Sequence, residues 1–372
     1  MILTCTLTQE PIVYPIHCLS DLFEDLNVLV NDLKKHANKI VILCDDRVAS
    51  LYGETLRAHL GTHIETSLFH FPSGEIHKTR ETKASLEDQL HSQSFGRDTA
   101  LIALGGGITC DLAGYIAATY CRGIPLFLVP TSLLAMVDAC IGGKTAVNLP
   151  WGKNLVGTIY QPKSIWIATK FLETLPLREL RCGFSEMIKH ALIADAESFS
   201  FLETHVDELL SLRSPWMEKA LIQSLKIKKA IVEVDEKESG MRHLLNLGHT
   251  IGHALEKVTD HLLPHGEAIA IGILVECHIS HLLGFLSKDV CERIRMVFAA
   301  YAIPLWLPKN LSQSEILESL KHDKKALHQS PRFSLIEDIG SPLSFEGAYC
   351  TPVPDSVITT ALDWMVHDLC RH

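Results

Sequence analysis

The first half of the chain alternates short apolar runs with stretches of helical periodicity. Four runs rich in Val, Ile, Leu and Phe predict strands at 39–46, 66–75, 99–107 and 124–130. Strands that alternate with helices in this way are typical of a parallel sheet covered by helices. From residue 175 helical periodicity dominates to the C-terminus. We therefore predict an α/β domain with a parallel sheet over 1–174 and an all-α domain over 175–372.

Length and charge limit the kind of protein. A single hydrophobic core rarely grows beyond roughly 250–300 residues. The chain has 372 residues, so its length predicts two domains. Its 34 basic and 44 acidic residues give a formal charge of −10 with no basic run, so we expect neither nucleic acid nor membrane as a partner. The eleven cysteines form no CxxC pair and the N-terminus shows no signal-peptide pattern. We therefore expect a cytoplasmic protein with reduced thiols.

Three segments of the second half supply side chains that suit a divalent metal. These segments are 185–193, 244–256 and 263–272. Glu186 lies on a predicted amphipathic helix, with Lys189 one turn further along. His249 belongs to the middle segment, and His265, which precedes Gly266, begins the next predicted helix. A Glu/His/His set leaves coordination positions open, which a catalytic metal needs.

The polar residues of the middle segment indicate one polar face. Arg242, Asn246, His249 and His253 are spaced 4, 3 and 4, so a helix running through all four would align their side chains. His249 and His253 could also ligate one ion together. The intervening Glu of the HExxH zinc motif is missing, however, so this is no metalloprotease signature.

Two glycines in the same segment are costly in a helix. Gly248 and Gly252 each lower helix stability by roughly 1 kcal/mol relative to Ala. A plain surface helix would gain nothing from them. We therefore expect another backbone or a ligand to approach this helix closely.

Two glycine motifs in the first half bear on phosphate or dinucleotide binding. The run Gly105–Asp111 follows a predicted strand and opens a helix, so its free backbone N–H groups suit an anion. It nearly fits GxGxxG, but Cys110 stands at the third glycine and a tight turn explains the run equally well. The second motif, Gly142–Thr145, resembles the end of a P-loop, but Asp138 stands at the first glycine, so we expect no Walker NTPase. Lys144 beside two glycines still suits a phosphate, because the backbone can approach closely.

Taken in order, these motifs resemble the 3-dehydroquinate synthase family of sugar phosphate cyclases. The resemblance runs from PSGEIHK at 72–78 through GGGITCDLAGYIAATYCRG, VPTSLLAMVDACIGGKTAVN and GKNLVGTIYQP to the metal segments and HDKKAL at 322–327. It implies an N-terminal domain that binds NAD and a helical C-terminal domain that carries a divalent metal, zinc first and cobalt as the alternative. It also implies a homodimer.

The resemblance further implies a reaction. In the family, 3-deoxy-D-arabino-heptulosonate 7-phosphate is oxidised at carbon five by NAD, loses phosphate, is re-reduced, opens and closes by an aldol step to 3-dehydroquinate. This is a step of the shikimate pathway, which supplies chorismate and aromatic amino acids. The close alternative is another sugar phosphate cyclase acting on sedoheptulose 7-phosphate or glucose 6-phosphate, but Arg242 and Lys228 suit a substrate with a carboxylate. A metal-dependent alcohol or glycerol dehydrogenase and a non-catalytic protein of the same fold are more distant alternatives.

The resemblance assigns roles by position in the family's motifs. The implied metal ligands are Glu186, His249 and His265, which leaves His253 on the substrate side. The implied catalytic residues are Arg122, Asp138, Lys144, Asn154, Lys189 and His253, and all but Asp138 would hold the phosphate. The implied substrate-binding residues are Lys228, Arg242, Asn246 and one of Lys324 or Lys325. The implied NAD contacts are Ser73, Gly74, Glu75, Lys78, Gly105, Gly106, Gly107, Asp111, Thr131, Ser132, Lys144, Lys153, Phe171 and Thr174.

The chain departs from the family's pattern at three positions around the cofactor. Cys110 replaces a glycine, Ser73 replaces an aspartate and Ser132 replaces a threonine. Cys110 and Ser73 are expected to lower the affinity for NAD without abolishing activity. Arg122 is expected to reach the substrate of the partner subunit.

Overall fold

The computed structural model describes residues 11–260, 262–308, 311–321 and 331–370. Contacts within the chain divide these residues into two compact units. Unit 1 comprises the chain up to Pro130 together with Gly143–Ile167, and unit 2 comprises Thr131–Gly142 and the chain from Ala168 onward. The units interleave along the sequence, and the single boundary expected after residue 174 stays a prediction.

Unit 1 is built on a six-stranded sheet with the order β1-β8-β5-β4-β2-β3. Its strands are β1 (Ile16–Leu19), β2 (Lys39–Asp45), β3 (Glu65–Phe71), β4 (Thr99–Gly105), β5 (Leu126–Pro130) and β8 (Ser164–Ala168). The pairs from β3 through to β8 are parallel, and Lys39 lies opposite both Glu65 and Thr99. Every residue of β4, β5 and β8 is buried, as in parallel sheets covered on both faces. The predicted parallel α/β domain is confirmed.

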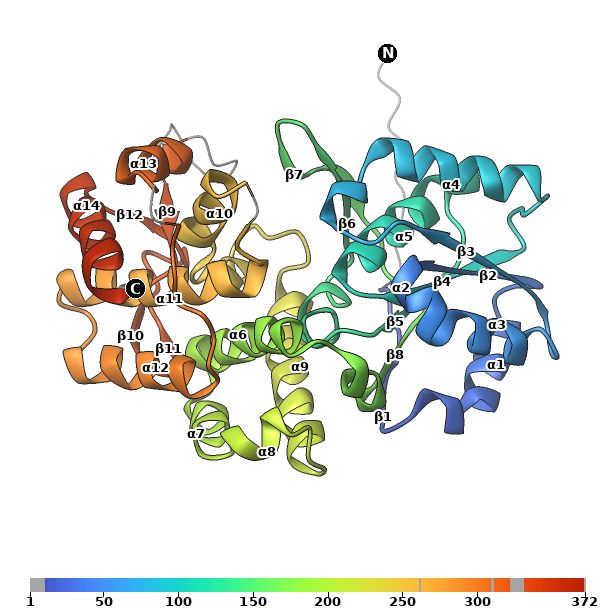
Figure 1. Ribbon diagram of the computed structural model, residues 1–372, viewed down its shortest axis with the longest axis horizontal. Helices are drawn as coiled ribbons and strands as arrows, with labels where there is room; N and C mark the ends of the chain where they lie inside the picture. Colours follow the sequence, from blue (N-terminus) through green and yellow to red (C-terminus); the bar gives the residue numbers. More distant parts are fainter. Residues whose placement is uncertain (1–10, 261, 309–310, 322–330, 371–372) are drawn as a thin grey trace, which may run out of the picture. The chain divides into compact units, whose positions relative to one another are not determined.

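Helices cover both faces of this sheet. They are α1 (Leu26–Lys34), α2 (Asp46–Val48), α3 (Glu54–Leu60), α4 (Arg80–Ser92) and α5 (Gly107–Thr119). α1 and α3 lie on one face, and α4 and α5 lie on the other (Figure 1). The chain moves across the sheet in one direction from β1 through β2 to β3, and in the opposite direction from β3 through β4 to β5. Because crossovers between parallel strands are right-handed, the helices of the first path cover one face and those of the second path cover the other.

An antiparallel hairpin, which the sequence did not predict, lies between β5 and β8 in the chain. It consists of β6 (Lys144–Leu149) and β7 (Gly152–Ile159), and Lys144 pairs with Ile159. β6 packs closely on α5, since a Cβ at Gly114 would lie 2.4 Å from the Thr145 Cγ2 atom. The glycine motif at 142–145 therefore leads into a strand and not into a helix.

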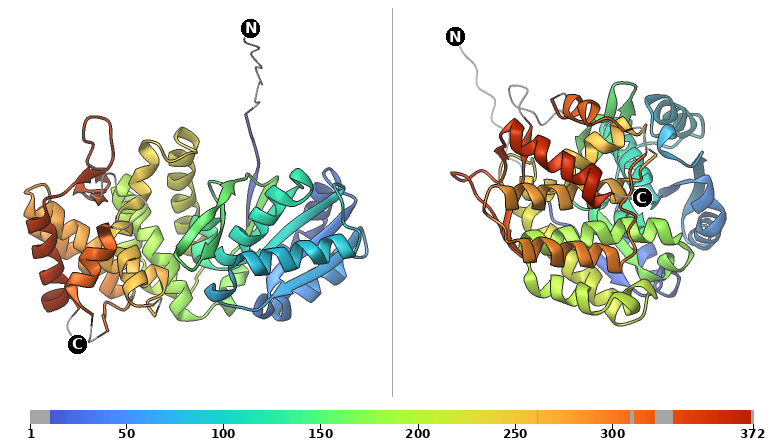
Figure 2. Two further views of the ribbon diagram at one scale, coloured as in Figure 1. Left: turned by 90° about the horizontal axis from the view of Figure 1, so that it is seen from above. Right: turned by 60° about the vertical axis from the view of Figure 1, so that its left-hand side comes forward.

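Unit 2 is predominantly helical, as predicted. Its helices are α6 (Leu177–Ala194), α7 (Ala196–Thr204), α8 (Val206–Leu210), α9 (Trp216–Val234), α10 (His249–Val258), α11 (His265–Leu282), α12 (Lys288–Ala300), α13 (Gln313–Lys321) and α14 (Asp355–Trp364). The short strands β9 (Arg332–Phe333), β10 (Ile336–Asp338), β11 (Ser341–Pro342) and β12 (Thr351–Pro352) accompany them. α11 packs against α6, α10, α12 and α14, and Figure 2 shows this helical layer from two further sides.

Short 3₁₀ and π segments complete the chain. The 3₁₀ segments are η1 (Leu22–Glu24), η3 (Glu75–His77), η4 (Tyr120–Arg122), η6 (Thr169–Thr174) and η7 (Met241–Asn246). The π segments are η2 (Ala49–Gly53), η5 (Ala135–Ala139) and η8 (Met365–Leu369). Within the described ranges, no helix combines the length and the apolar character needed to cross a membrane.

Glycines bring α10 and α11 into close contact. A Cβ on Gly272 would lie 2.0 Å from the carbonyl oxygen of Gly248, and a Cβ on Gly252 would lie 2.6 Å from the Ile269 Cδ1 atom. Real Cβ contacts are never this short, so only glycine lets the two helices pack at this separation. The close approach of another backbone, expected from the helix-weakening glycines, is confirmed.

Glycines also bring α6 close to the start of α11. A Cβ on Gly266 would lie 2.3 Å from the Cα atom of Cys182. A Cβ on Gly183 would lie 2.5 Å from the Cβ atom of Leu133, in the segment before η5. The helices that carry the expected metal ligands are therefore packed so closely that no residue larger than glycine fits at these contacts.

The helix considered for residues 242–253 is interrupted. η7 ends at Asn246, Leu247 is non-helical with ψ 124°, and Gly248 is left-handed with φ +79° before α10 begins at His249. The carboxylate of Glu276 accepts a hydrogen bond from the Gly248 N–H at 2.8 Å and holds this turn. The alignment of all four polar side chains on one helical face is therefore wrong.

Replacing Gly272 by Ala tests the helix contact. The new methyl group would overlap the Gly248 carbonyl, and overpacking of this kind costs about 1–3 kcal/mol. We expect the thermal unfolding midpoint to fall by roughly 2–10 °C, measured by circular dichroism. The control is Gly53→Ala, where the backbone is helical and the methyl group would meet only side chains, at 3.2–3.4 Å. Equal midpoints for the two variants would contradict the account.

Candidate active site

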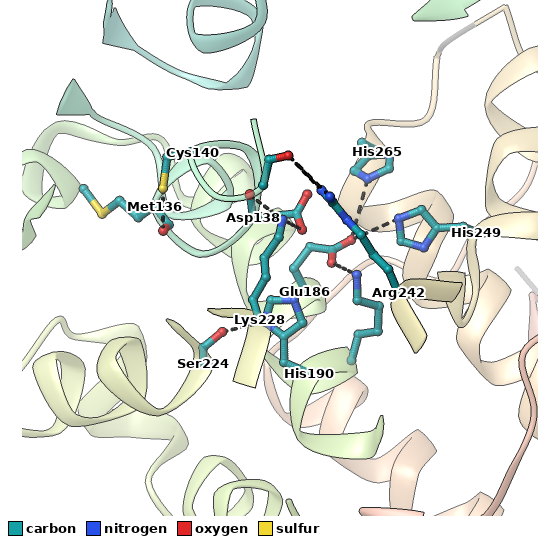
Figure 3. A network of polar contacts seen from close by, with 12 residues as sticks. Met136, Asp138, Cys140, Glu186, His190, Ser224, Lys228, Arg242, His249 and His265 are labelled. Carbon is teal, nitrogen blue, oxygen red and sulfur yellow. Dashed lines mark hydrogen bonds and ion pairs between the residues drawn. The ribbon is translucent and has the colours of Figure 1, made fainter. Parts of the chain in front are cut away.

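Three side chains from three helices of unit 2 converge on one point. Glu186 lies in the middle of α6, His249 is the first residue of α10 and His265 is the first residue of α11. The Glu186 Oε1 atom is 3.6 Å from the Nε2 atom of each histidine, and Figure 3 shows both imidazoles pointing at the carboxylate. Glu186 is completely buried, while the side chains of His249 and His265 are 11% and 29% exposed.

The spacing of these atoms suits a divalent metal. Tetrahedral ligands at roughly 2.0–2.2 Å from zinc lie about 3.3–3.5 Å apart, close to the 3.6 Å between Glu186 Oε1 and each Nε2. Among the described residues, Glu186 Oε1 accepts no hydrogen bond. A buried carboxylate oxygen without a partner is costly, and a cation at this point would satisfy it. The residues present therefore fit a metal.

Both imidazoles are oriented through their Nδ1 atoms. His249 Nδ1 lies 3.2 Å from the carbonyl oxygen of Leu247, and His265 Nδ1 lies 3.3 Å from the carboxylate of Glu256. A proton on Nδ1 that is donated to these oxygens leaves the Nε2 lone pair facing Glu186. Metal-binding histidines commonly have this arrangement.

Two overlapping groups also bring potential ligand atoms within 4.8 Å of one another. They are His253–Glu256–His265 and Asp138–Glu186–His190. In the first, Glu256 faces the Nδ1 atom of His265 and not its Nε2 atom. In the second, lysine ammonium groups already pair with both carboxylates. The Glu186–His249–His265 set fits a cation best, and its role as the metal site remains a prediction.

Two ion pairs adjoin the carboxylate of Glu186. Lys189 pairs with Glu186 itself, and Lys228 donates to both the carboxylate and the backbone carbonyl of Asp138. Burial raises the pKa of Glu186, but the Lys189 ammonium outweighs this effect and lowers it to about 2. Burial likewise raises the pKa of Asp138, and Lys228 and Lys189 bring it well below its usual range. The structure thus brings these four expected residues together.

Arg242 is a buried cation held by neutral groups. Its Nη1 and Nη2 atoms lie 3.3 Å from the Gly142 carbonyl oxygen, and Nη1 also donates to the carbonyl of Glu236. Among the residues that the structure describes, its guanidinium forms no ion pair. Gly142 has φ +98°, and a Cβ there would lie 2.2 Å from Nη2. Gly142 is therefore needed to leave room for the guanidinium of Arg242. From the sequence, this glycine was expected to let the backbone come close to a phosphate.

Of the other expected substrate residues of unit 2, the structure describes Asn246 and His253. Asn246 donates from Nδ2 to the Glu238 carboxylate at 2.9 Å. The His253 ring is 5.2 Å from that of His249 and 6.0 Å from that of His265, measured between centroids. The predicted substrate lysines Lys324 and Lys325 lie outside the described residues.

Three of the expected NAD-binding residues of unit 1, Glu75, Lys78 and Asp111, belong to a second polar cluster. Lys78 is buried and donates to the Asp111 carboxylate at 2.5 Å and to the Asn154 Oδ1 atom at 2.6 Å. Asn148 donates to the Glu75 carboxylate at 2.7 Å and accepts from the Asn154 N–H at 3.0 Å. The loop after β3, helix α5 and the β6–β7 hairpin are joined through these contacts.

The glycine run lies at the carboxyl end of β4, where parallel sheets bind ligands. Gly105 ends the strand, Gly106 is the N-cap of α5 and Gly107 begins the helix. Gly74 has φ +114° beside Ser73, before η3. The position of Gly106 leaves the first N–H groups of α5 available to an anion.

The remaining expected residues are distributed over both units, and their roles stay predictions. Arg122 is exposed in η4 with φ +65°, Lys144 begins β6, Lys153 lies on β7, Thr131 and Ser132 follow β5, and Phe171 and Thr174 lie in η6. Cys110 is buried within α5. The effect of Cys110 and Ser73 on NAD affinity is likewise a prediction.

Sequence reasoning missed several polar groups of these sites. Asp45 ends β2 and accepts a hydrogen bond from the Ser73 hydroxyl at 2.9 Å; its position at the end of a predicted strand was the available signal. His190 is completely buried, and its Nδ1 atom is 2.7 Å from the Ser224 hydroxyl. No spacing rule marks this hydrogen bond, because Ser224 lies on another helix, 34 residues further along the chain.

Two family models match the chain. The model described as 3-dehydroquinate synthase N-terminal matches residues 68–182, and the one described as 3-dehydroquinate synthase C-terminal matches residues 183–326. A 3-dehydroquinate synthase from Nitrosospira multiformis is 38% identical over 94% of this chain and 94% of its own length.

Two solved structures are similar over most of the chain. A 2-deoxy-scyllo-inosose synthase complexed with carbaglucose-6-phosphate, NAD⁺ and Co²⁺ has a TM-score of 0.85 and 26% identity, over 93% of this chain and 95% of its own. ValA, a 2-epi-5-epi-valiolone synthase from Streptomyces hygroscopicus subsp. jinggangensis with NAD⁺ and Zn²⁺ bound, has a TM-score of 0.86 and 28% identity, over 97% and 99%. The curated relatives, at higher identity, favour 3-dehydroquinate synthase over these sibling cyclases.

Burial of His190 predicts acid sensitivity. Burial lowers its pKa from 6.5 to about 3, with a further contribution from Lys189. As the pH falls below 6.5 the unfolded chain takes up this proton first, so the folded state loses stability until the pH reaches about 3. At pH 4.5 this loss amounts to about 2–3 kcal/mol at most.

His190→Gln removes this titration. We expect its unfolding midpoint to fall less than that of the unmodified protein between pH 7 and 4.5, measured by thermal unfolding. The control is His63→Gln at an exposed position, which should follow the unmodified protein. Parallel pH profiles for His190→Gln and the unmodified protein would contradict this explanation.

Proposed function

The chain belongs to the 3-dehydroquinate synthase family, and from that premise we propose how its residues divide the work of the reaction. It is an NAD- and metal-dependent carbon–oxygen lyase that converts 3-deoxy-D-arabino-heptulosonate 7-phosphate to 3-dehydroquinate and phosphate. The observation that carries the assignment of residues is the convergence of Glu186 with the Nε2 atoms of His249 and His265.

Glu186, His249 and His265 would hold the metal. When bound, the metal supplies a Lewis acid for the carbon-five hydroxyl and later for the ketone, and NAD supplies the hydride acceptor and donor. Glu186 contributes a negative charge that Lys189 keeps ionised over the physiological range. With the metal bound, the Nε2 lone pairs of the two histidines would complete a set with positions left for substrate oxygens.

Arg242 is proposed to bind the substrate carboxylate. Its buried guanidinium is held by the carbonyl groups of Gly142 and Glu236, which fix its direction without neutralising its charge. A planar guanidinium binds a carboxylate through two parallel hydrogen bonds. Sibling cyclases act on substrates without a carboxylate, so a buried arginine of this kind supports the acid substrate. Asn246 and Lys228 are proposed to bind the same part of the substrate.

The phosphate is assigned to Lys144, Asn154, Lys189, His253 and Arg122. These residues are proposed to hold the phosphate group next to the substrate proton that the phosphate itself removes when it is eliminated. Such positioning can lower the activation barrier by up to roughly 7–11 kcal/mol. We infer that Asn154 also links the phosphate to the cofactor. This inference is supported by Lys78, which donates to both Asn154 and Asp111, since Lys78 and Asp111 are proposed NAD residues.

The identity of the metal, the cellular compartment and the oligomeric state are also proposed. Zinc is the favoured metal, because a Glu/His/His set with open positions suits it, although cobalt fits the same ligands. The cytoplasm is the proposed compartment, since the cysteines that the structure describes are free thiols. A homodimer is proposed from the family resemblance, with Arg122 acting on the substrate of the partner subunit.

The activity is tested by release of phosphate. Purified protein supplied with NAD, zinc and 3-deoxy-D-arabino-heptulosonate 7-phosphate should release phosphate without net NADH, and chelation of the metal should abolish release. Phosphate is measured colorimetrically and NADH by absorbance. If phosphate is released from sedoheptulose 7-phosphate or glucose 6-phosphate but not from the acid substrate, the protein is one of the sibling cyclases instead.

Gly142→Ala tests the role of Arg242. The added Cβ would displace the guanidinium, and loss of a charge-assisted hydrogen bond of about 1.5–3 kcal/mol raises KM for the acid substrate by roughly 10–100-fold. Arg242→Lys should raise KM similarly, because an ammonium lacks the planar fork. In the double variant the effects should not add, since both act through one contact. Additive effects, or an unchanged KM in Gly142→Ala, would show that Gly142 does not act through Arg242.

A further inference from the structure

Glu256 is a buried carboxylate on α10. It belongs to none of the expected metal, substrate or NAD sites. Its side chain is 4% exposed, and its neighbours on the helix, Ala254 and Leu255, belong to the apolar core of unit 2. Its Oε2 atom lies 3.3 Å from the Nδ1 atom of His265. The contact joins α10 to the first residue of α11, across the helix pair that the glycines hold together.

A carboxylate at this position is costly unless it has a specific use. Desolvation of a charged group costs several kcal/mol, and a well-packed apolar residue of similar volume is often as stable or more stable. The contact with the Nδ1 atom of His265 offers such a use.

The two histidines of the site differ in what holds their Nδ1 atoms. The backbone carbonyl of Leu247 accepts from His249, and its place is set by the turn before α10. For His265 the acceptor is the side chain of Glu256. His265 begins its helix after Pro264 and is the more exposed of the two, so its ring depends more on a side-chain partner.

We propose that Glu256 is a positioning residue for the metal site. Its carboxylate accepts the Nδ1–H of His265, selects the tautomer with a free Nε2 atom and keeps that atom directed at Glu186. A negative partner also makes the imidazole a stronger ligand. This inference rests on the proposed metal role of Glu186, His249 and His265. The competing explanation makes Glu256 itself a ligand, together with His253 and His265.

The test is a titration with Co²⁺ alone, followed by visible absorption of the bound ion. Glu256→Leu should weaken Co²⁺ binding by roughly 10–100-fold and alter the absorption bands. Glu256→Gln should weaken it less, because the amide oxygen still accepts the Nδ1–H. Binding equal to that of the unmodified protein in Glu256→Leu would overturn the proposal, and Glu256→Gln carries the test if the leucine variant does not fold.

Two further variants complete the design. Glu267→Gln is the matched control, because Glu267 is a fully buried carboxylate on α11 that pairs with Arg178 at 2.6 and 2.9 Å, and it should bind Co²⁺ like the unmodified protein. Glu186→Gln should lose Co²⁺ binding. If Glu186→Gln keeps Co²⁺ and Glu256→Gln loses it, Glu256 is a ligand and the positioning role is wrong. If the unmodified protein binds no Co²⁺, the proposed metal site itself fails.

Discussion

The close packing of α6, α10 and α11 is the constraint on which the site depends. Gly272 meets the Gly248 carbonyl, Gly252 meets Ile269, and Gly266 meets the backbone of α6, all at separations that exclude a Cβ. Each of these three helices contributes one of the converging side chains. An extra methyl group at the contact would force the helices apart, because Cβ separations of 2.0–2.6 Å are too short to be tolerated. The glycines therefore set the relative positions of Glu186, His249 and His265, and their cost in helix stability is offset by packing.

Charge is arranged in this part of unit 2 so that nearly every buried ion has a partner. Lys189 pairs with Glu186, and Lys228 pairs with Asp138. Arg242 differs, because carbonyl groups hold it while its charge stays available to an anion. Pairs of this kind add little to stability after desolvation. Their value lies in a fixed electrostatic environment, in which the carboxylates of Glu186 and Asp138 remain ionised.

Much of the fold could be predicted, because long buried strands and amphipathic helices leave strong periodic patterns. The runs that became β2 to β5 were visible, whereas β1 has only four residues and the β6–β7 hairpin has no clear alternation. β8 was missed although it is as long and as buried as β5. The break before α10 was missed because spacing alone does not reveal a left-handed Gly248. The proposed ligand set came from family motifs and stays a prediction, whereas the ion pair of Lys228 with Asp138 depends on tertiary contacts. Glu256 was missed for the same reason, since its partner lies on another helix.

The central claim is that Glu186, His249 and His265 bind one catalytic metal ion. Anomalous diffraction from crystals of the Co²⁺-loaded protein tests it most directly. The account predicts one peak at roughly 2.0–2.2 Å from a Glu186 oxygen and from the Nε2 atoms of both histidines. A peak coordinated by His253, Glu256 and His265, or by Asp138 and His190, would contradict it.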